Sequence, residues 1–91
     1  MSDHVMKSWT FLFDPIFKGT RTSDIRSKKD REFHIRDTCL LQEYDPATGQ
    51  YTGRECKVEI THIIDSRTPC ALSSAILDDN YCVLSIRKVQ L

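Results

Sequence analysis

The chain has 91 residues, of which 40% are hydrophobic, and its 13 Lys and Arg balance 13 Asp and Glu. A chain of this length forms one small domain around a single core, which excludes a second lobe or a large enclosed active site. Charged residues make up 29% of the chain and Gly and Pro are few, so the composition also excludes a disordered or collagen-like protein.

The beginning of the chain predicts a short strand followed by a helix. Residues 4–8 favour the strand, and residues 10–18 place apolar side chains at helical spacing ahead of Gly19, which suits a helix C-cap. Pro15 complicates this helix. Either it kinks the helix by removing one backbone hydrogen bond, or it takes the first helical position after an Asp14 cap and leaves barely one turn.

Residues 22–26 predict a strand, and a hairpin of two further strands follows it. The arms of the hairpin are residues 38–44 and 54–65, joined by a turn in which Gly49 supplies a positive φ. Gly53 is expected to mark a β-bulge where the second arm resumes.

The second arm of the hairpin is the most regular segment of the chain. Its residues alternate with period 2, which predicts one apolar face made of Cys56, Val58, Ile60 and Ile64. His62 falls on the same face, where we expect a hydrogen-bonded histidine in the core or at its rim.

The end of the chain predicts a loop and a last strand. Residues 66–79 are expected to form a loop that holds a short helical turn. Residues 81–89 predict a strand that completes the sheet, with apolar side chains on both faces, as where one face packs in a barrel and the other meets a helix. The sequence contains no internal repeat or linker, so we predict one domain over residues 1–91.

The cysteines and histidines do not form a metal-site pattern. Cys39, Cys56, Cys70 and Cys82 include no CxxC pair, and the three His match no metalloprotease motif. We expect no metal and no cofactor. The cysteines are interpreted as structural thiols, since reduced Cys behaves as a small hydrophobe.

The N-terminal residues lack the basic flank and apolar run of a signal peptide, and no segment reaches the roughly 20 apolar residues of a membrane helix. We therefore expect a cytoplasmic protein without membrane contact.

Charge is unevenly distributed along the neutral chain. Residues 18–36 contain seven Lys and Arg against three Asp and Glu, a local charge of +4, so the remainder carries −4. A neutral protein can therefore present a basic mouth to a phosphate, since the local field decides such an encounter. The alternative for Lys28, Lys29 and Arg31 is an ordinary solvated loop.

The run GTRTSDIR, from Gly19 to Arg26, resembles the G-x-K-x-x-E-x-R signature of the ASCH (activating signal cointegrator homology) domains, a branch of the PUA-like superfamily. Residues 4–7, 30–37 and 43–55 follow in an order similar to the small bacterial and phage subfamily of unknown function. In that subfamily the motifs H-x-L-K, N-D-R-D-F-x-x-G-D and E-Y-D-x-x-T-G-x-Y-T-G-R recur.

The resemblance covers most of the chain and implies an α+β fold. The expected structure is a small PUA-like β-barrel of about five to six strands with one or two short helices. Its opening is lined by the Gly19 motif, and PUA-like relatives bind RNA or modified bases there. We therefore predict a module that binds RNA or a modified nucleoside or nucleotide, locally rather than by a broad grip on a duplex.

The ligand-binding candidates are mostly basic residues in and around this motif. Arg21 is the strongest, because a guanidinium grasps phosphate bidentately, whereas Asp24 holds an arginine in place or accepts a proton from a base amine. The set is Lys7, Arg21, Thr22, Asp24, Arg26, Lys28, Arg31 and Arg54. For Arg26 the alternative is an internal salt bridge with Asp24 or Asp37. Trp9, Tyr44 and Tyr51 either stack on bases or pack the hairpin.

An enzymatic reading is weaker. Some small ASCH proteins are amidohydrolases acting on acylated cytidine with a Lys, a Thr and a Glu. Here Arg21 stands at the lysine position and stays protonated, Asp24 stands at the threonine position, and residues 66–77 contain no Glu. Arg36 also replaces the glycine of the family's G-D turn. We therefore assign no catalytic residues and keep the amidohydrolase as a disfavoured alternative. A protein-binding accessory factor is the second alternative.

Overall fold

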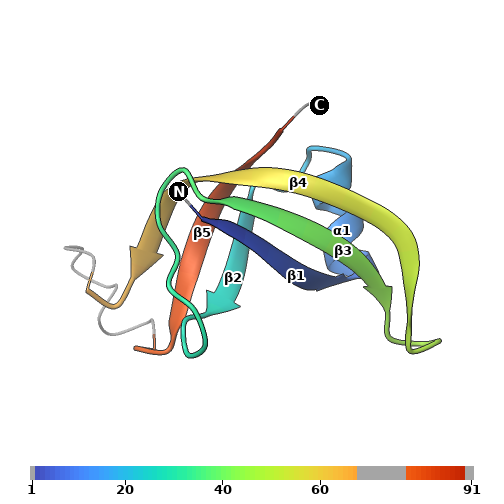
Figure 1. The fold of residues 1–91 in the computed structure, drawn as a ribbon, viewed down its shortest axis with the longest axis horizontal. Helices are drawn as coiled ribbons and strands as arrows, with labels where there is room; N and C mark the ends of the chain where they lie inside the picture. Colours follow the sequence, from blue (N-terminus) through green and yellow to red (C-terminus); the bar gives the residue numbers. More distant parts are fainter. Residues whose placement is uncertain (1, 68–77, 90–91) are drawn as a thin grey trace.

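The computed structural model describes residues 2–67 and 78–89 (Figure 1). Their elements follow in the order β1 (Asp3–Trp9), α1 (Thr10–Phe17), β2 (Ser23–Ser27), β3 (Thr38–Asp45), β4 (Gln50–Asp65) and β5 (Tyr81–Lys88). The strands form one five-stranded sheet in the order β1-β3-β4-β5-β2. β1 runs parallel to β3, and the other neighbours are antiparallel. All five predicted strands are confirmed, in a small α+β fold with one short helix in the described ranges.

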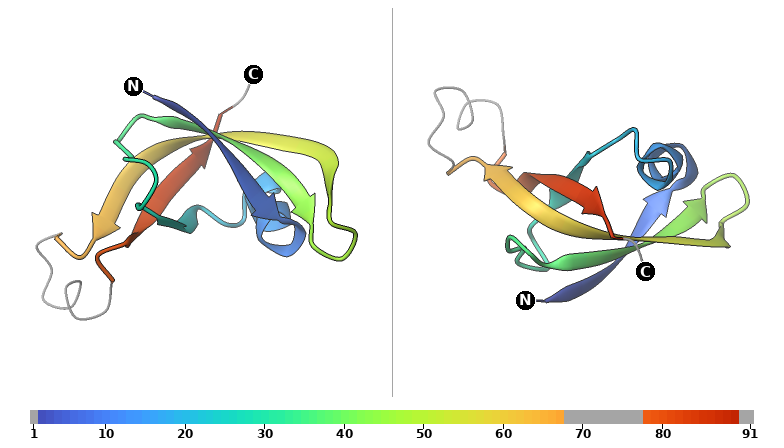
Figure 2. Two further views of the ribbon diagram at one scale, coloured as in Figure 1. Left: turned by 60° about the horizontal axis from the view of Figure 1, so that its bottom comes forward. Right: turned by 90° about the horizontal axis from the view of Figure 1, so that it is seen from above.

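The sheet is strongly curled, so that its two edge strands approach each other (Figure 2). Arg26 of β2 donates a hydrogen bond from Nη1 to the carbonyl oxygen of Lys7 in β1, at 3.0 Å. The two edges therefore lie within reach of one arginine side chain, although β1 and β2 do not pair. We call the boundary between the unpaired edges of β1 and β2, which the Arg26 side chain bridges, the seam.

The helix α1 ends in a glycine cap, as the sequence predicts. Gly19 has a φ of +82°, which glycine adopts without the steric cost that a Cβ imposes. Its N–H donates to the carbonyl of Ile16, and the N–H of Thr20 donates to that of Pro15, the bond pattern of a Schellman motif. Pro15 lies inside the helix, so of the two alternatives the one in which Asp14 caps a one-turn helix is wrong. Burial of Phe13 and Ile16 offsets the one backbone bond that Pro15 removes.

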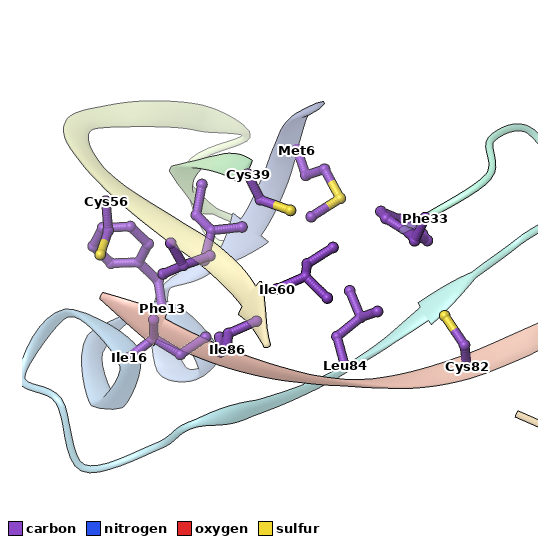
Figure 3. Packing of buried hydrophobic residues seen from close by; sticks show 12 residues of the cluster. Met6, Phe13, Ile16, Phe33, Cys39, Cys56, Ile60, Cys82, Leu84 and Ile86 are labelled. Atoms are coloured by element: carbon purple, nitrogen blue, oxygen red, sulfur yellow. The ribbon is translucent and has the colours of Figure 1, made fainter. Parts of the chain in front are cut away.

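The core fills the concave side of the sheet, where α1 covers one end (Figure 3). Phe33, from the loop between β2 and β3, packs at the other end beside Met6 (Figure 3). The buried hydrophobic residues are Met6, Phe13, Ile16, Phe33, Cys39, Leu41, Cys56, Val58, Ile60, Cys82, Leu84 and Ile86. Three of the four cysteines are thus buried and free, as expected for structural thiols. Cys70 lies outside the described residues, as does most of the predicted loop and helical turn at 66–79.

A β-bulge overturns the predicted face of His62. The pairing of β4 with β5 shifts between Ile60 and His62, so one extra residue enters β4 there. Because side chains alternate with period 2, one inserted residue exchanges the faces beyond it. His62 and Ile64 are consequently exposed, and Ile63 packs against the core in their place.

The hairpin between β3 and β4 follows the prediction closely. Gly49 and Gly53 both have positive φ, and a second register shift lies between Gln42 and Tyr44, opposite residues 52–54 of β4. β4 begins at Gln50, four residues before the predicted start.

The strand β5 differs from expectation in its surroundings. Its neighbours are β4 and β2, and it buries one face only, because Cys82, Leu84 and Ile86 point to the core while Tyr81 is exposed. The described helix lies on the same concave side as that buried face.

No helix within residues 2–67 and 78–89 is long and apolar enough to cross a membrane.

Candidate ligand-binding site

The Gly19 motif places two arginines on one buried carboxylate. Asp24 is only 6% exposed, and its two oxygens accept from different guanidinium groups. Arg21 Nη2 donates to Oδ1 at 3.2 Å, and Arg26 Nε donates to Oδ2 at 2.6 Å. Arg21 also donates to the carbonyl of Leu12, which anchors it to α1. The sequence alternative of an internal Arg26 to Asp24 salt bridge is therefore confirmed, and Arg21 joins it.

Two backbone carbonyl groups of β1 accept hydrogen bonds from arginine side chains across the seam. Arg26 donates to the carbonyl of Lys7, and Arg31 Nη1 lies 3.5 Å from that of Val5. Val5 and Lys7 are two residues apart, so their carbonyls point to the same edge of the strand. Because β1 pairs with β3 on its other side, these arginines occupy the free edge of β1.

A cleft of about 740 Å³ opens where the loop after β2 meets the end of β4. Arg31 belongs to both the seam and this cleft. Four of the described residues that line it are basic, namely Lys28, Lys29, Arg31 and Arg67, and four are acidic, namely Asp30, Glu32, Asp65 and Asp79. Phe33, Ile63, Ser66 and Cys82 complete the described lining. The lining is therefore charge-balanced.

Asp65 organises the cations at one wall of the cleft. Its Oδ2 accepts from Lys28 Nζ at 3.1 Å and from Arg67 Nη2 at 3.0 Å. Burial opposes ionisation of this carboxyl, but the hydrogen bonds from Arg67 and Lys28 outweigh burial and lower its pKa to about 2. Asp65 and Asp24 thus play a similar part, because each carboxylate accepts hydrogen bonds from two basic side chains.

The comparison with protein families identifies the chain. A family model described as a domain of unknown function (DUF3850) matches residues 3–86. The chain belongs to this family. The matched span includes both edges of the seam and the described lining of the cleft. A search of curated proteins finds no match.

The side chains of two predicted site residues in this DUF3850 domain lie away from the seam and the cleft. Lys7 points to the outer face of the sheet, where its Nζ lies 4.2 Å from the centre of the Tyr44 ring. Arg54 forms a bidentate pair with the buried Glu43, with both N···O distances at 2.8 Å, and donates to Asp14 of α1. The guanidinium of Arg54 therefore ties the helix to the hairpin.

The remaining candidate is Thr22, just before β2. Its side chain is exposed, and its carbonyl accepts from the N–H of Ile86, which extends the pairing of β2 with β5. The structure therefore brings Arg21, Asp24, Arg26 and Arg31 together at the seam, with Lys28 in the adjoining cleft.

A buried pair in this DUF3850 domain, His4 with Asp37, was not among the predicted site residues. Asp37 is fully buried and lies 2.9 Å from His4 Nε2, while His4 packs against the ring of Phe33 at 4.8 Å. Burial opposes ionisation, but hydrogen bonds from His4 and from the N–H groups of Ser2 and His34 lower the pKa of Asp37. The signal was present in the sequence, because alternation in β1 puts His4 on the same face as the buried Met6.

The environment of the three described cysteines does not activate their thiols. Burial raises the pKa of the Cys39 thiol to about 11 and also raises those of Cys56 and Cys82, so none of these three is a ready nucleophile. In residues 2–67 and 78–89, no three His, Cys, Asp or Glu side chains come together as a metal site. At the seam, Arg21, Arg26 and Arg31 provide guanidinium N–H donors.

Proposed function

We propose that this DUF3850 domain is a PUA-like module, related to ASCH domains, that binds RNA or a modified nucleotide at the seam and the adjoining cleft. The observation that carries the proposal is the buried Asp24 carboxylate with Arg21 and Arg26 fixed on it. Two guanidinium groups against one carboxylate leave a net positive charge at the seam. Held side chains lose little rotamer entropy when a phosphate binds, which favours affinity.

Donor capacity supports a phosphate contact at the seam. A guanidinium has five N–H donors, and Arg26 directs only Nε and Nη1 to the acceptors described above. Further N–H groups of Arg26 are therefore available for a phosphate oxygen, and Arg31 stands beside it on the same edge of β1. Such contacts recognise phosphate without reading sequence.

The cleft supports a nucleotide rather than a duplex. A volume of about 740 Å³ lies in the range of small-ligand pockets. Its balanced acidic and basic lining offers both acceptors and donors, as the edge of a base requires. A balanced lining also gives little long-range attraction to bulk phosphate, in keeping with the zero net charge of the chain.

The test is a binding titration at two salt concentrations. Fluorescence anisotropy of a labelled eight-nucleotide single-stranded RNA measures the affinity of the wild type, of Arg21→Ala and of Arg31→Ala. We expect each substitution to weaken binding by about 5- to 150-fold, because a bidentate contact contributes about 1–3 kcal/mol, and to reduce the salt dependence. NMR shifts with nucleoside monophosphates should map to residues 21–33.

The matched control is Arg87→Ala, whose side chain is 66% exposed and is paired with Glu59 at the end of β5. This substitution should leave RNA affinity within twofold of the wild type. Absence of RNA and nucleotide binding, or equal losses in Arg31→Ala and Arg87→Ala, would overturn the proposal.

A further inference from the structure

Three aromatic side chains from three neighbouring strands lie side by side on the outer face of the sheet. The strand register places Trp9 of β1 opposite Tyr44 of β3, and Tyr44 opposite Tyr51 of β4. The Tyr44 and Tyr51 rings meet edge to face at 5.2 Å, and Phe11 meets Trp9 at 6.3 Å. We call Trp9, Tyr44 and Tyr51 the aromatic row.

The aromatic row faces away from the core and is open to solvent. In β1 the buried residues alternate with exposed ones, and Trp9 belongs to the exposed set. Trp9 is 48% exposed and Tyr51 54%, while Phe11 beside them is 66% exposed. The described helix α1 lies on the opposite, concave side (Figure 2). Contiguous exposed aromatic surface is costly in water, and such surface typically marks an interaction site.

A lysine gives the row a cationic character. Lys7 Nζ lies 4.2 Å from the centre of the Tyr44 ring, a cation–π contact. In the register, Lys7 lies opposite Gln42, directly beside the pair of Trp9 and Tyr44. Aromatic rings with an adjacent cation are typical of surfaces that bind single-stranded nucleic acid, where bases stack and phosphates meet the charge.

The row is continuous with the seam through β1. The side chain of Lys7 lies on the aromatic row, while its carbonyl accepts from Arg26 at the seam. Only the width of one strand, about 4.8 Å, separates the two surfaces. Since one nucleotide spans more than this distance, a strand bound at Arg26 and Arg31 can cross β1 and lay its next bases on the row.

We propose that the aromatic row is a stacking platform for bases of a single-stranded nucleic acid whose phosphates are held at the seam. This inference rests on the proposed function, because it extends the ligand from one nucleotide at the seam to a strand. Its particular consequence is a length dependence. An oligonucleotide should bind more tightly than a mononucleotide, and the extra affinity should come from the row.

The experiment uses Trp9 as its reporter, because Trp9 is the single tryptophan of the chain. A base stacked on an indole quenches its fluorescence, so we titrate the full-length protein with octauridylate and, separately, with uridine monophosphate. We expect saturable quenching with octauridylate and none with the mononucleotide at equal occupancy. Tyr51→Ala should weaken octauridylate binding by about 5- to 50-fold, and Tyr51→Phe, which keeps the ring, should bind like the wild type.

The control for Tyr51→Ala is Tyr81→Ala. Tyr81 is also exposed, at 43%, but it lies at the start of β5 beside Ser27 and outside the row. This variant should bind octauridylate like the wild type. Circular dichroism confirms that each variant is folded before its affinity is compared.

The outcomes separate this inference from the proposed function. If octauridylate binds and Arg31→Ala weakens it, but Trp9 is not quenched and Tyr51→Ala binds normally, the row is no platform and the seam site stands. Quenching that depends on Tyr51 but not on Arg21 or Arg31 would show base stacking without a phosphate contact at the seam, which overturns both the seam site and the inference as stated. No binding by any probe overturns both. A concentration-dependent dimer that Tyr51→Ala dissociates, seen by analytical ultracentrifugation, makes the row an interface between copies and overturns the inference.

Discussion

Replacing Asp37 by Asn tests the buried centre that joins β1 to the loop before β3. The Asp37 carboxylate is fully buried and accepts from the N–H groups of Ser2 at 2.8 Å and His34 at 2.9 Å, with His4 Nε2 also at 2.9 Å. Asparagine keeps the shape but turns one acceptor oxygen into an NH₂ group, which faces one of these donors. It also removes the negative charge from the other two bonds.

The expected loss follows from the kind of bond. A hydrogen bond to a charged group contributes about 1.5–3 kcal/mol and a neutral one about 1 kcal/mol. One such bond lost and two weakened amount to about 3 kcal/mol of unfolding free energy for Asp37→Asn. In a domain of this size that corresponds to a fall in Tm of about 10–20 °C. This is a large fraction of the stability of a small domain, which is about 5–15 kcal/mol.

The loss of unfolding free energy in Asp37→Asn should be larger at neutral pH than at acid pH. The pKa of Asp37 is lower in the folded protein than its ordinary value of 3.8. A carboxyl with a depressed folded pKa stabilises the fold above its unfolded pKa, and this stabilisation is lost as the pH falls through the folded pKa. The difference between wild type and Asp37→Asn should therefore be complete at pH 7 and shrink below about pH 4.

Urea unfolding followed by circular dichroism at pH 7 and pH 3 measures both effects. Asp30→Asn is the control in the same loop, because the Asp30 side chain is 72% exposed, and it should change stability by less than about 0.5 kcal/mol. A loss under 1 kcal/mol in Asp37→Asn at pH 7, or an equal loss at both pH values, would refute the account of Asp37 as an ionised acceptor.

Two further predictions concern the backbone and the core. Arg36 has a φ of +80°, a conformation that costs a residue with a Cβ about 1–2 kcal/mol. Glycine avoids this cost, but its greater conformational entropy in the unfolded state cancels part of the gain. Arg36→Gly should therefore raise the free energy of unfolding by about 0.5–1 kcal/mol in urea unfolding, whereas Arg36→Ala should bring no gain. Equal behaviour of the two variants would contradict backbone strain at Arg36. Cys39 is fully buried, and burial raises the pKa of its thiol to about 11. An alkylating reagent at pH 8 should therefore modify Cys39 at least about 100-fold more slowly in the native protein than in urea. Peptide mass spectrometry measures the two rates. Rapid native labelling of Cys39 would show that this part of the core opens.

The local elements could be predicted from sequence because each carries its own signal. Period-2 alternation located β4, turn-forming residues located the hairpin that joins β4 to β3, and an apolar segment located β5. The spacing of Phe13 and Ile16 ahead of Gly19 indicated α1 and its cap. The bulge after Ile60 left no such signal, because the pattern reads equally well without an inserted residue. For this reason the face of His62 was predicted incorrectly.

The candidate site was predictable only in part, because several of its contacts join residues that are far apart in the sequence. The run from Gly19 to Arg26 and its local charge of +4 marked the basic segment. Which arginines pair internally depends on contacts across the fold: Asp24 holds Arg21 and Arg26, whereas Asp37 accepts from His4 and not from Arg26. Arg54 likewise depends on Glu43 and Asp14, which are 11 and 40 residues away in the chain.

The sequence by itself determined where the strands and the helix lie, that three cysteines belong to apolar strand segments, and that positive charge gathers before residue 37. Only the tertiary structure decided that β1 lies parallel to β3, that β1 and β2 form the two sides of a seam, and that Trp9, Tyr44 and Tyr51 align on the outer face. The physical reason is that propensity and periodicity act between near neighbours in the chain. Strand order and ion pairing are instead settled by burial and hydrogen bonding between distant segments.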